Sequence, residues 1–246
     1  MANRPKAGGV HVRRRPFYYL PPGFGSPDMS TQAFAKWRRW LDRIENDQLR
    51  DLLINRHIFH QFRDCITPHV GSDRGATLAS WVGQNYVAFA TTAIRRMVEP
   101  PKESWKSISL VILLTDLAAN DSLLTRQRFR GFYGNSVAQP FADRDFATIT
   151  GSKAATRMSA PRINRDIRAL QAASKKIKKL VDKVVAHTEA DRRKVPRVQF
   201  GEIDKAIDLL EATFKRYCLL LNGSCPNRIV PVDDFDVVQD LKRIWP

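Results

Sequence analysis

The sequence has few cysteines, no long apolar stretch and none of the common catalytic signatures. Its 246 residues include three cysteines, at positions 65, 218 and 225. So few thiols cannot build a disulfide framework and are typical of a reducing compartment. No unbroken apolar run is longer than Leu110–Leu114, whereas a bilayer-spanning helix needs about 20 apolar residues. We therefore expect a cytoplasmic protein without a membrane span.

Catalytic motifs that would identify a large enzyme class are also missing. The sequence contains no Walker phosphate loop, no GxSxG nucleophile elbow, no HExxH zinc motif and no paired CxxC. We therefore expect no bound cofactor and no metal, and function has to be inferred from charge and from weaker patterns.

Positive charge is abundant and unevenly distributed. The formal net charge is +16, from 41 basic and 25 acidic residues. Residues 1–20 have a net charge of +5 and residues 161–200 of +8, so these two segments hold 13 of the 16 excess charges. Concentrated positive charge favours a polyanionic partner, most often nucleic acid. The alternative is that the charge serves only solubility.

The composition divides the chain into an arm and one domain. Residues 1–28 contain Gly8-Gly9, Pro21-Pro22 and the basic run Arg13–Arg15, and the glycines and prolines interrupt any regular element. We expect a flexible basic arm that either reaches RNA or a partner or, as we favour, packs its aromatic residues on the domain or on a neighbouring subunit. Residues 29–246 are expected to form a single helical domain.

Apolar residues in this domain recur at intervals of three and four, which predicts helices and no strand. Ser107 is expected to cap the fourth helix, Pro161 to lie in the first turn of a long basic helix, and Gly223 to stop the last helix. Residues 134–160 are expected to form a loop with a short helix. The fold class is therefore all-α, an antiparallel helical bundle. The predicted helices span residues 30–44, 49–67, 78–98, 108–119, 122–132, 161–195 and 201–221.

One segment near the end of the long basic helix carries a candidate site. Lys183 precedes His187 by one turn, so both side chains share a helix face. A neighbouring cation lowers the pKa of an imidazole and favours its neutral, basic form. The pair is suited to bind a phosphate and to move a proton. The alternative is that His187 only packs against a neighbouring helix.

The same segment carries a family resemblance. Asp182-Lys183-x-x-Ala186-His187 resembles the terminal motif of HEPN (higher eukaryote and prokaryote nucleotide-binding) proteins, in particular their abortive-infection U-type branch. The resemblance covers roughly Leu49 to the C-terminus, and the order of its pieces along the chain carries it. The other matching stretches are Ala93–Arg96 followed by Ser107–Leu110, Phe200–Asp204 followed by Ala206-Ile207, and Tyr217–Leu221.

The resemblance implies a dimeric antiparallel helical bundle in a bacterial protein of the phage-defence or toxin type, directed at RNA and paired with an antitoxin or another partner protein. In active family members an arginine and a histidine, four to six residues apart, cleave RNA without a metal. The histidine serves as general acid or base and the arginine stabilises phosphate charge.

This chain has Val181 or Asp182 where the family has its arginine. Asp182, Lys183 and His187 carry over as catalytic candidates, with Lys183 as the positive charge. Arg95, Arg96, Arg192 or Arg193 are further sources of an arginine. Two functions stay open: a metal-independent endoribonuclease that uses His187 at a homodimer interface, or a catalytically silent helical dimer that binds nucleic acid or a partner protein.

Basic residues on both sides of His187 are the predicted phosphate contacts, because affinity for nucleic acid comes largely from neutralising phosphates. The alternative for such a charge run is a solvated helix face. The predicted contacts are Lys175, Lys176, Lys178, Lys179, Arg192, Arg193 and Lys194, with Arg95 and Arg96 from an earlier helix.

Two other groupings have weaker functional interpretations. Arginines alternate with aromatic residues over 126–133, a pattern that can stack bases, although we favour aromatics that pack inward. His57, His60, Cys65 and His69 contain ligand types suited to zinc, but their helical spacing does not converge on one point. Ordinary helix side chains are the preferred interpretation of these four residues.

Overall fold

The computed structural model describes residues 29–67, 73–101, 107–134, 137–185, 191–230 and 238–239. The predicted arm over residues 1–28 lies outside these ranges, as do His69 and His187. The predictions for the arm, for His69 and for His187 therefore lie outside the described residues.

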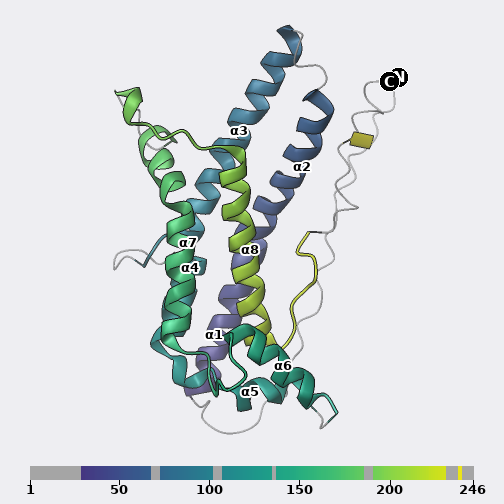
Figure 1. The fold of residues 1–246 in the computed structure, drawn as a ribbon, viewed down its shortest axis with the longest axis vertical. Coiled ribbons are helices and arrows are strands. Elements are labelled where there is room, and N and C mark those ends of the chain that lie inside the picture. The colour runs from purple at the N-terminus through teal and green to yellow at the C-terminus, as the bar shows by residue number, and fades with distance from the viewer. Residues whose placement is uncertain are drawn as a thin grey trace, which may run out of the picture.

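The part of the chain that the structure describes is helical and contains no strand, which confirms the all-α class (Figure 1). The nearest approach to sheet structure is one isolated bridge between Thr125 and Arg157. The α-helices are α1 (Met29–Ile44), α2 (Arg50–Ile66), α3 (Asp73–Val98), α4 (Leu110–Ala119), α5 (Arg126–Arg130), α6 (Gln139–Thr150), α7 (Ala160–Leu180) and α8 (Phe200–Asn222). Shorter turns are the π-helical η1 (Glu45–Leu49) and η5 (Val181–Val185), and the 3₁₀ turns η3 (Asp121–Leu123), η4 (Gly131–Tyr133) and η6 (Arg192–Lys194).

The first two predicted helices form one continuous helical segment, which we call the helical rod. α1 passes through η1 directly into α2, because no proline or glycine stands between them to stop a helix. The buried residues step from Ile44 to Leu49, an interval of five, which is the hydrogen-bond interval of a π turn. The π turn therefore keeps both apolar runs on the same side of the helical rod.

The long helices lie along one another, and the short ones close one end. In Figure 1, α2 and α3 lie side by side and project at the upper end, whereas α5 and α6 lie at the lower end. α7 packs against α3, α4 and α8. This arrangement leaves one face of α7 turned away from the core.

The core confirms two predictions, the burial of the apolar helix over residues 108–119 and the burial of one face of the last helix. α4 is buried over most of its surface, and Trp37 of α1, which has no exposed surface, donates its indole N–H to Asp116 of α4 at 2.5 Å. The predicted inner face of α8 is buried at every position, namely Ile203, Ile207, Leu210, Phe214, Cys218 and Leu221.

Several predicted boundaries are wrong. The cap of α4 is Ser109, whose hydroxyl accepts the amide of Ile112 at 3.1 Å; Ser107 lies too far from the first turn to reach it. The predicted helix over 122–132 is broken into η3, α5 and η4, because Thr125 is extended and caps α5 itself.

The long basic helix also ends earlier than predicted. α7 begins at Ala160 with Pro161 in its first turn, as expected, but the helical path is described only to Val185, and residues 192–194 form a separate 3₁₀ turn. The predicted continuation to Pro196 is therefore wrong. Gly223 ends α8 in the left-handed conformation with φ of +71°, which confirms its predicted role.

Candidate nucleic-acid interface

α7 is strongly basic, and its only carboxylate faces inward. The helix contains seven lysines and arginines and one acid, Asp166. That side chain is 8% exposed, and it accepts hydrogen bonds at 3.0 Å from Arg162 on the same helix and from Arg216 and Tyr217 on α8. Because Asp166 is saturated by these partners, it does not neutralise the outer face of α7.

The outer face of α7 carries a row of four exposed cations, Arg165, Arg168, Lys175 and Lys179, which we call the outer row. Their intervals of three, seven and four place them on one side of the helix. At about 1.5 Å per residue the row extends over about 21 Å. Within the described part of the chain, none of the four makes an ion pair, and Lys178 beside them is also exposed and unpaired.

Two ion pairs border this row. On one side Lys176 binds the carboxylate of Glu202 on α8, with its Nζ at 2.8 and 2.9 Å from the two oxygens. The Lys176 ammonium lowers the pKa of Glu202 below its ordinary value. On the other side Arg95 of α3 contacts Asp182 of η5 at 2.7 Å. Lys176 and Arg95, both predicted phosphate contacts, are therefore already paired with carboxylates.

The remaining predicted contacts lie on two other elements. Arg96 of α3 is exposed and has no ion pair with a described residue. In η6, Arg193 and Lys194 both approach Asp191, at 3.3 and 3.8 Å. Arg192 belongs to the same turn, and its side chain is not described.

The family-like motif begins in a π turn. Asp182 and Lys183 lie in η5, and Val184 is 49% exposed. π turns within α-helices are frequent at functional sites. Arg95 is the arginine that the fold brings to the motif, and its Nε has no hydrogen-bond partner among the described residues. Sequence spacing alone does not reveal this contact, because residues 95 and 182 belong to separate helices.

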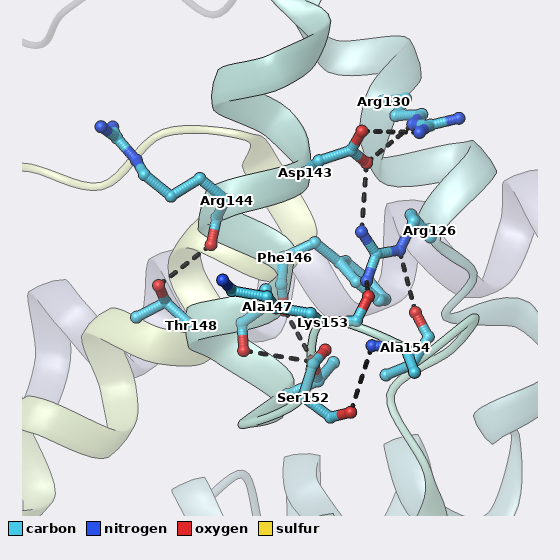
Figure 2. Close-up of polar contacts among 12 residues, drawn as sticks. Arg126, Arg130, Asp143, Arg144, Phe146, Ala147, Thr148, Ser152, Lys153 and Ala154 are labelled. Carbon is cyan, nitrogen blue, oxygen red and sulfur yellow. Dashed lines mark hydrogen bonds and ion pairs between the residues drawn. The ribbon is translucent and has the colours of Figure 1, made fainter.

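A second cluster of charges lies at the end formed by α5 and α6 (Figure 2). Arg126 donates to the carbonyl oxygens of Ala155 and Lys153 at 2.9 and 2.7 Å, and to Asp143 at 3.2 Å. Arg130 also binds both oxygens of Asp143, and its guanidinium lowers the pKa of that carboxyl. Because each guanidinium nitrogen of Arg126 makes one of these bonds, the cluster connects α5 to α6 and to the loop that follows.

This cluster borders an open pocket of about 650 Å³. Arg144 and Lys153 bring further positive charge to its rim, but the hydroxyl of Thr148 donates to the carbonyl of Arg144, and that of Ser152 accepts the amide of Ala154. These contacts connect neighbouring segments of the protein and give the pocket a structural role. The pocket is lined by Arg126, Asp143, Arg144, Ala147, Thr148, Gly151, Ser152 and Lys153.

The aromatic residues of this end pack inward, as favoured from the sequence. Phe129 is 1% exposed and contacts the rings of Phe132, Tyr133 and Phe146 at centroid distances of 5.5–6.0 Å. Arg128 lies over the ring of Phe34, 3.7 Å from its centre. These rings are therefore part of the packing of the domain and do not form a stacking platform for bases.

The two histidines of α2 have different environments. His60 Nε2 lies 3.0 Å from Asp204 Oδ1 on α8, and His57 Nε2 is buried without a partner in the described structure. Over the described residues, no three side chains of the metal-binding types come together. His57, His60 and Cys65, the described members of the candidate set, therefore do not form a metal site with one another.

Comparison with known proteins identifies no relative. The sequence matches no protein-family model, no curated protein and no solved structure. Among the described helices, none combines the length and apolar character needed to cross a membrane. The HEPN resemblance stays a prediction that rests on the sequence motifs.

Proposed function

We propose that this protein binds nucleic acid, RNA in particular, along the outer row of α7. The observation that carries the proposal is the absence of any ion pair, within the described residues, at Arg165, Arg168, Lys175 and Lys179 on a helix whose only acid is buried. Cations that do not contribute to folding through internal ion pairs are free to exchange counterions for phosphates. The choice of RNA rests on the motif resemblance.

Binding by this row has a measurable electrostatic signature. Each phosphate that is neutralised lowers the slope of log K against log salt by about 0.7 for a single strand and about 0.9 for a duplex. Four contacts therefore predict a slope of about −3 to −4.

The test compares two double variants in fluorescence-anisotropy titrations with a labelled RNA at several salt concentrations. Lys175→Glu with Lys179→Glu should weaken binding at low salt more than tenfold and flatten the slope by at least about 1.4. The matched control, Arg39→Glu with Lys205→Glu, reverses two exposed cations on α1 and α8 and should have a smaller effect. Equal losses in both variants, or binding that does not depend on salt, would contradict the outer row as the binding surface.

A second function is favoured by the contact between Arg95 and Asp182. The motif segment, residues 181–187, contains no arginine, yet α3 supplies one at 2.7 Å from Asp182. This contact supports a metal-independent endoribonuclease in which His187 transfers the proton, Arg95 and Lys183 stabilise phosphate charge, and an antiparallel HEPN-like bundle dimerises near the exposed Val184. A phage-defence or toxin role, with an antitoxin, would accompany this activity.

Cleavage assays separate the two functions. If the protein cuts RNA, His187→Ala should lower the rate by about 10²–10⁴-fold, and Arg95→Ala should also lower it while binding persists. A chelator should leave the rate unchanged. Light scattering should give a dimer of the 28.1 kDa chain. An absence of cleavage across diverse RNAs, with binding intact, would leave the binding function alone.

A further inference from the structure

The turn that follows α8 brings two cysteines together. Gly223 takes the left-handed conformation, and its amide donates to the carbonyl of Leu219 at 2.9 Å. A Cβ atom at this position would collide with Phe132, so the turn is packed closely against η4. The chain therefore reverses at a defined point and returns Cys225 to the side of the helix that carries Cys218.

The Cys218 thiol contacts the backbone beside Cys225, whose own thiol donates to the carbonyl oxygen of Pro226 at 3.7 Å. Cys218 Sγ donates to the carbonyl oxygen of Ser224, the residue before Cys225, at 3.6 Å, and Asn222 Nδ2 donates to the same sulfur at 3.6 Å. The thiols also interact with each other: hydrogen bonding to Cys218 lowers the pKa of Cys225, and the Lys215 ammonium lowers it further, whereas its partial burial opposes these effects.

The two cysteines differ in exposure and in acidity. Cys218 is 4% exposed, and both its hydrogen bond to Cys225 and its burial raise its pKa. Cys225 is half-buried and borders solvent. A reactive thiol needs access and thiolate character, and a resolving thiol has to lie next to it. Cys225 therefore has the properties of the reactive thiol, and Cys218 has those of the resolving thiol.

We propose that Cys225 and Cys218 form a peroxide-sensitive thiol pair that oxidises to an intramolecular disulfide at the end of α8. In the first step the Cys225 thiolate attacks hydrogen peroxide, the O–O bond breaks, and the sulfur becomes a sulfenic acid. The released hydroxide takes a proton and leaves as water. In the second step the Cys218 sulfur attacks the Cys225 sulfur, the S–O bond breaks, and the hydroxyl leaves as water with the Cys218 proton. Two thiols lose two electrons, which reduce one peroxide to two waters.

The disulfide would join the last turn of α8 to the segment that carries the buried residues Ile229 and Val230. In the described structure that segment is attached through the backbone of the turn and through the burial of these two side chains. Oxidation therefore changes how firmly the chain beyond α8 is attached to the bundle, and it does so without involving the outer row of α7.

The test treats the full-length protein with one equivalent of hydrogen peroxide, alkylates it under denaturing conditions and maps the peptides by mass spectrometry. The expected result is a disulfide-linked Cys218–Cys225 peptide with Cys65 of α2 still alkylated. Cys225→Ser should abolish the linkage, and Cys65→Ser, the matched control, should retain it. Cys218→Ala should leave a sulfenic acid on Cys225 that dimedone traps.

Three outcomes would overturn the proposal. They are alkylation of both Cys218 and Cys225 after peroxide treatment, oxidation of Cys65 at the same rate as Cys225, and accumulation of sulfinic acid on Cys225 in the wild-type chain while Cys218 stays reduced. Because Cys225 lies in a turn beyond the helix, Cys225→Ser keeps the test informative even if Cys218→Ala does not fold.

Discussion

The inner and outer faces of α7 use positive charge in opposite ways. On the inner face, Arg162 is one of three donors gathered around the buried carboxylate of Asp166, together with Arg216 and Tyr217 from α8. On the outer face, the cations of the outer row stand without ion pairs to any described residue. The same residue types therefore hold the bundle together on one side and remain available to a partner on the other.

The difference follows from solvation. A charge that leaves water has to be matched by hydrogen bonds and by opposite charge, or it destabilises the fold strongly. A charge that stays in water carries no such requirement, so an unpaired surface cation costs little stability. Substitutions on the inner face should therefore change stability, and substitutions on the outer face should change binding.

The largest expected change in stability is the loss caused by removing the Asp166 side chain. Asp166→Ala leaves two arginines and a tyrosine without their common acceptor, and loss of one partner of a buried ionic group costs roughly 3–5 kcal/mol. We expect the lower end of this range, because the side chains of Arg162 and Arg216 are 22% and 29% exposed. Urea denaturation measures the change. The control is Asp182→Ala; equal losses in both would contradict the distinction between the faces.

Substitutions on the outer face should instead change RNA binding and leave the stability of the fold almost unchanged. Replacing Arg165, Arg168, Lys175 and Lys179 together by alanine should flatten the salt dependence of RNA binding by about 3 in log–log slope. The free energy of unfolding should change by less than about 0.5 kcal/mol per substitution, as is usual for surface positions. A large loss of stability with unchanged binding would reverse the assignment of this face.

Tyr217 makes the inner face sensitive to high pH. Burial, and then the charge of Asp166, raise the pKa of Tyr217 above its ordinary value of 10.0. Its contribution to stability is present below pH 10 and is lost as the pH rises above 10, because the unfolded chain then ionises first. Tyr217→Phe should cost about 1 kcal/mol at neutral pH and should reduce the alkaline loss. An unchanged pH profile in the variant would show that other groups cause it.

The smallest effect is expected from Asp182, which borders the outer face. Asp182→Ala releases Arg95 from an exposed ion pair, so the stability change should be under about 1 kcal/mol. Removing this carboxylate should strengthen RNA binding and make its salt dependence steeper by about 0.7. Weaker binding in Asp182→Ala would instead indicate that the pair positions Arg95 for the ligand.

The helix positions were predictable where periodicity and terminating residues agree. α8 has an apolar stripe that is buried throughout and a glycine that ends it, and α3 ends at Val98, just before Pro100. The boundaries between Asp121 and Gly151 were not predictable, because the extended Thr125 and its bridge to Arg157 depend on a neighbouring segment. Lys175 and Lys179 of the outer row were among the predicted contacts, whereas Arg165 and Arg168 were not, and the pairing of Lys176 with Glu202 depends on how α7 packs against α8.

By itself the sequence determined that the protein is all-α, that one helix is strongly basic, and that cysteine chemistry is limited to three thiols, because composition and a repeat of three to four residues are local properties. Only the tertiary structure decided which charges are neutralised and which thiols meet. Asp166 lies 50 residues from Arg216, and Arg95 lies 87 residues from Asp182, so their pairing depends on how the helices pack. The turn at Gly223, close in sequence to both cysteines, also packs so closely against Phe132 of η4 that a Cβ atom at this position would collide with it.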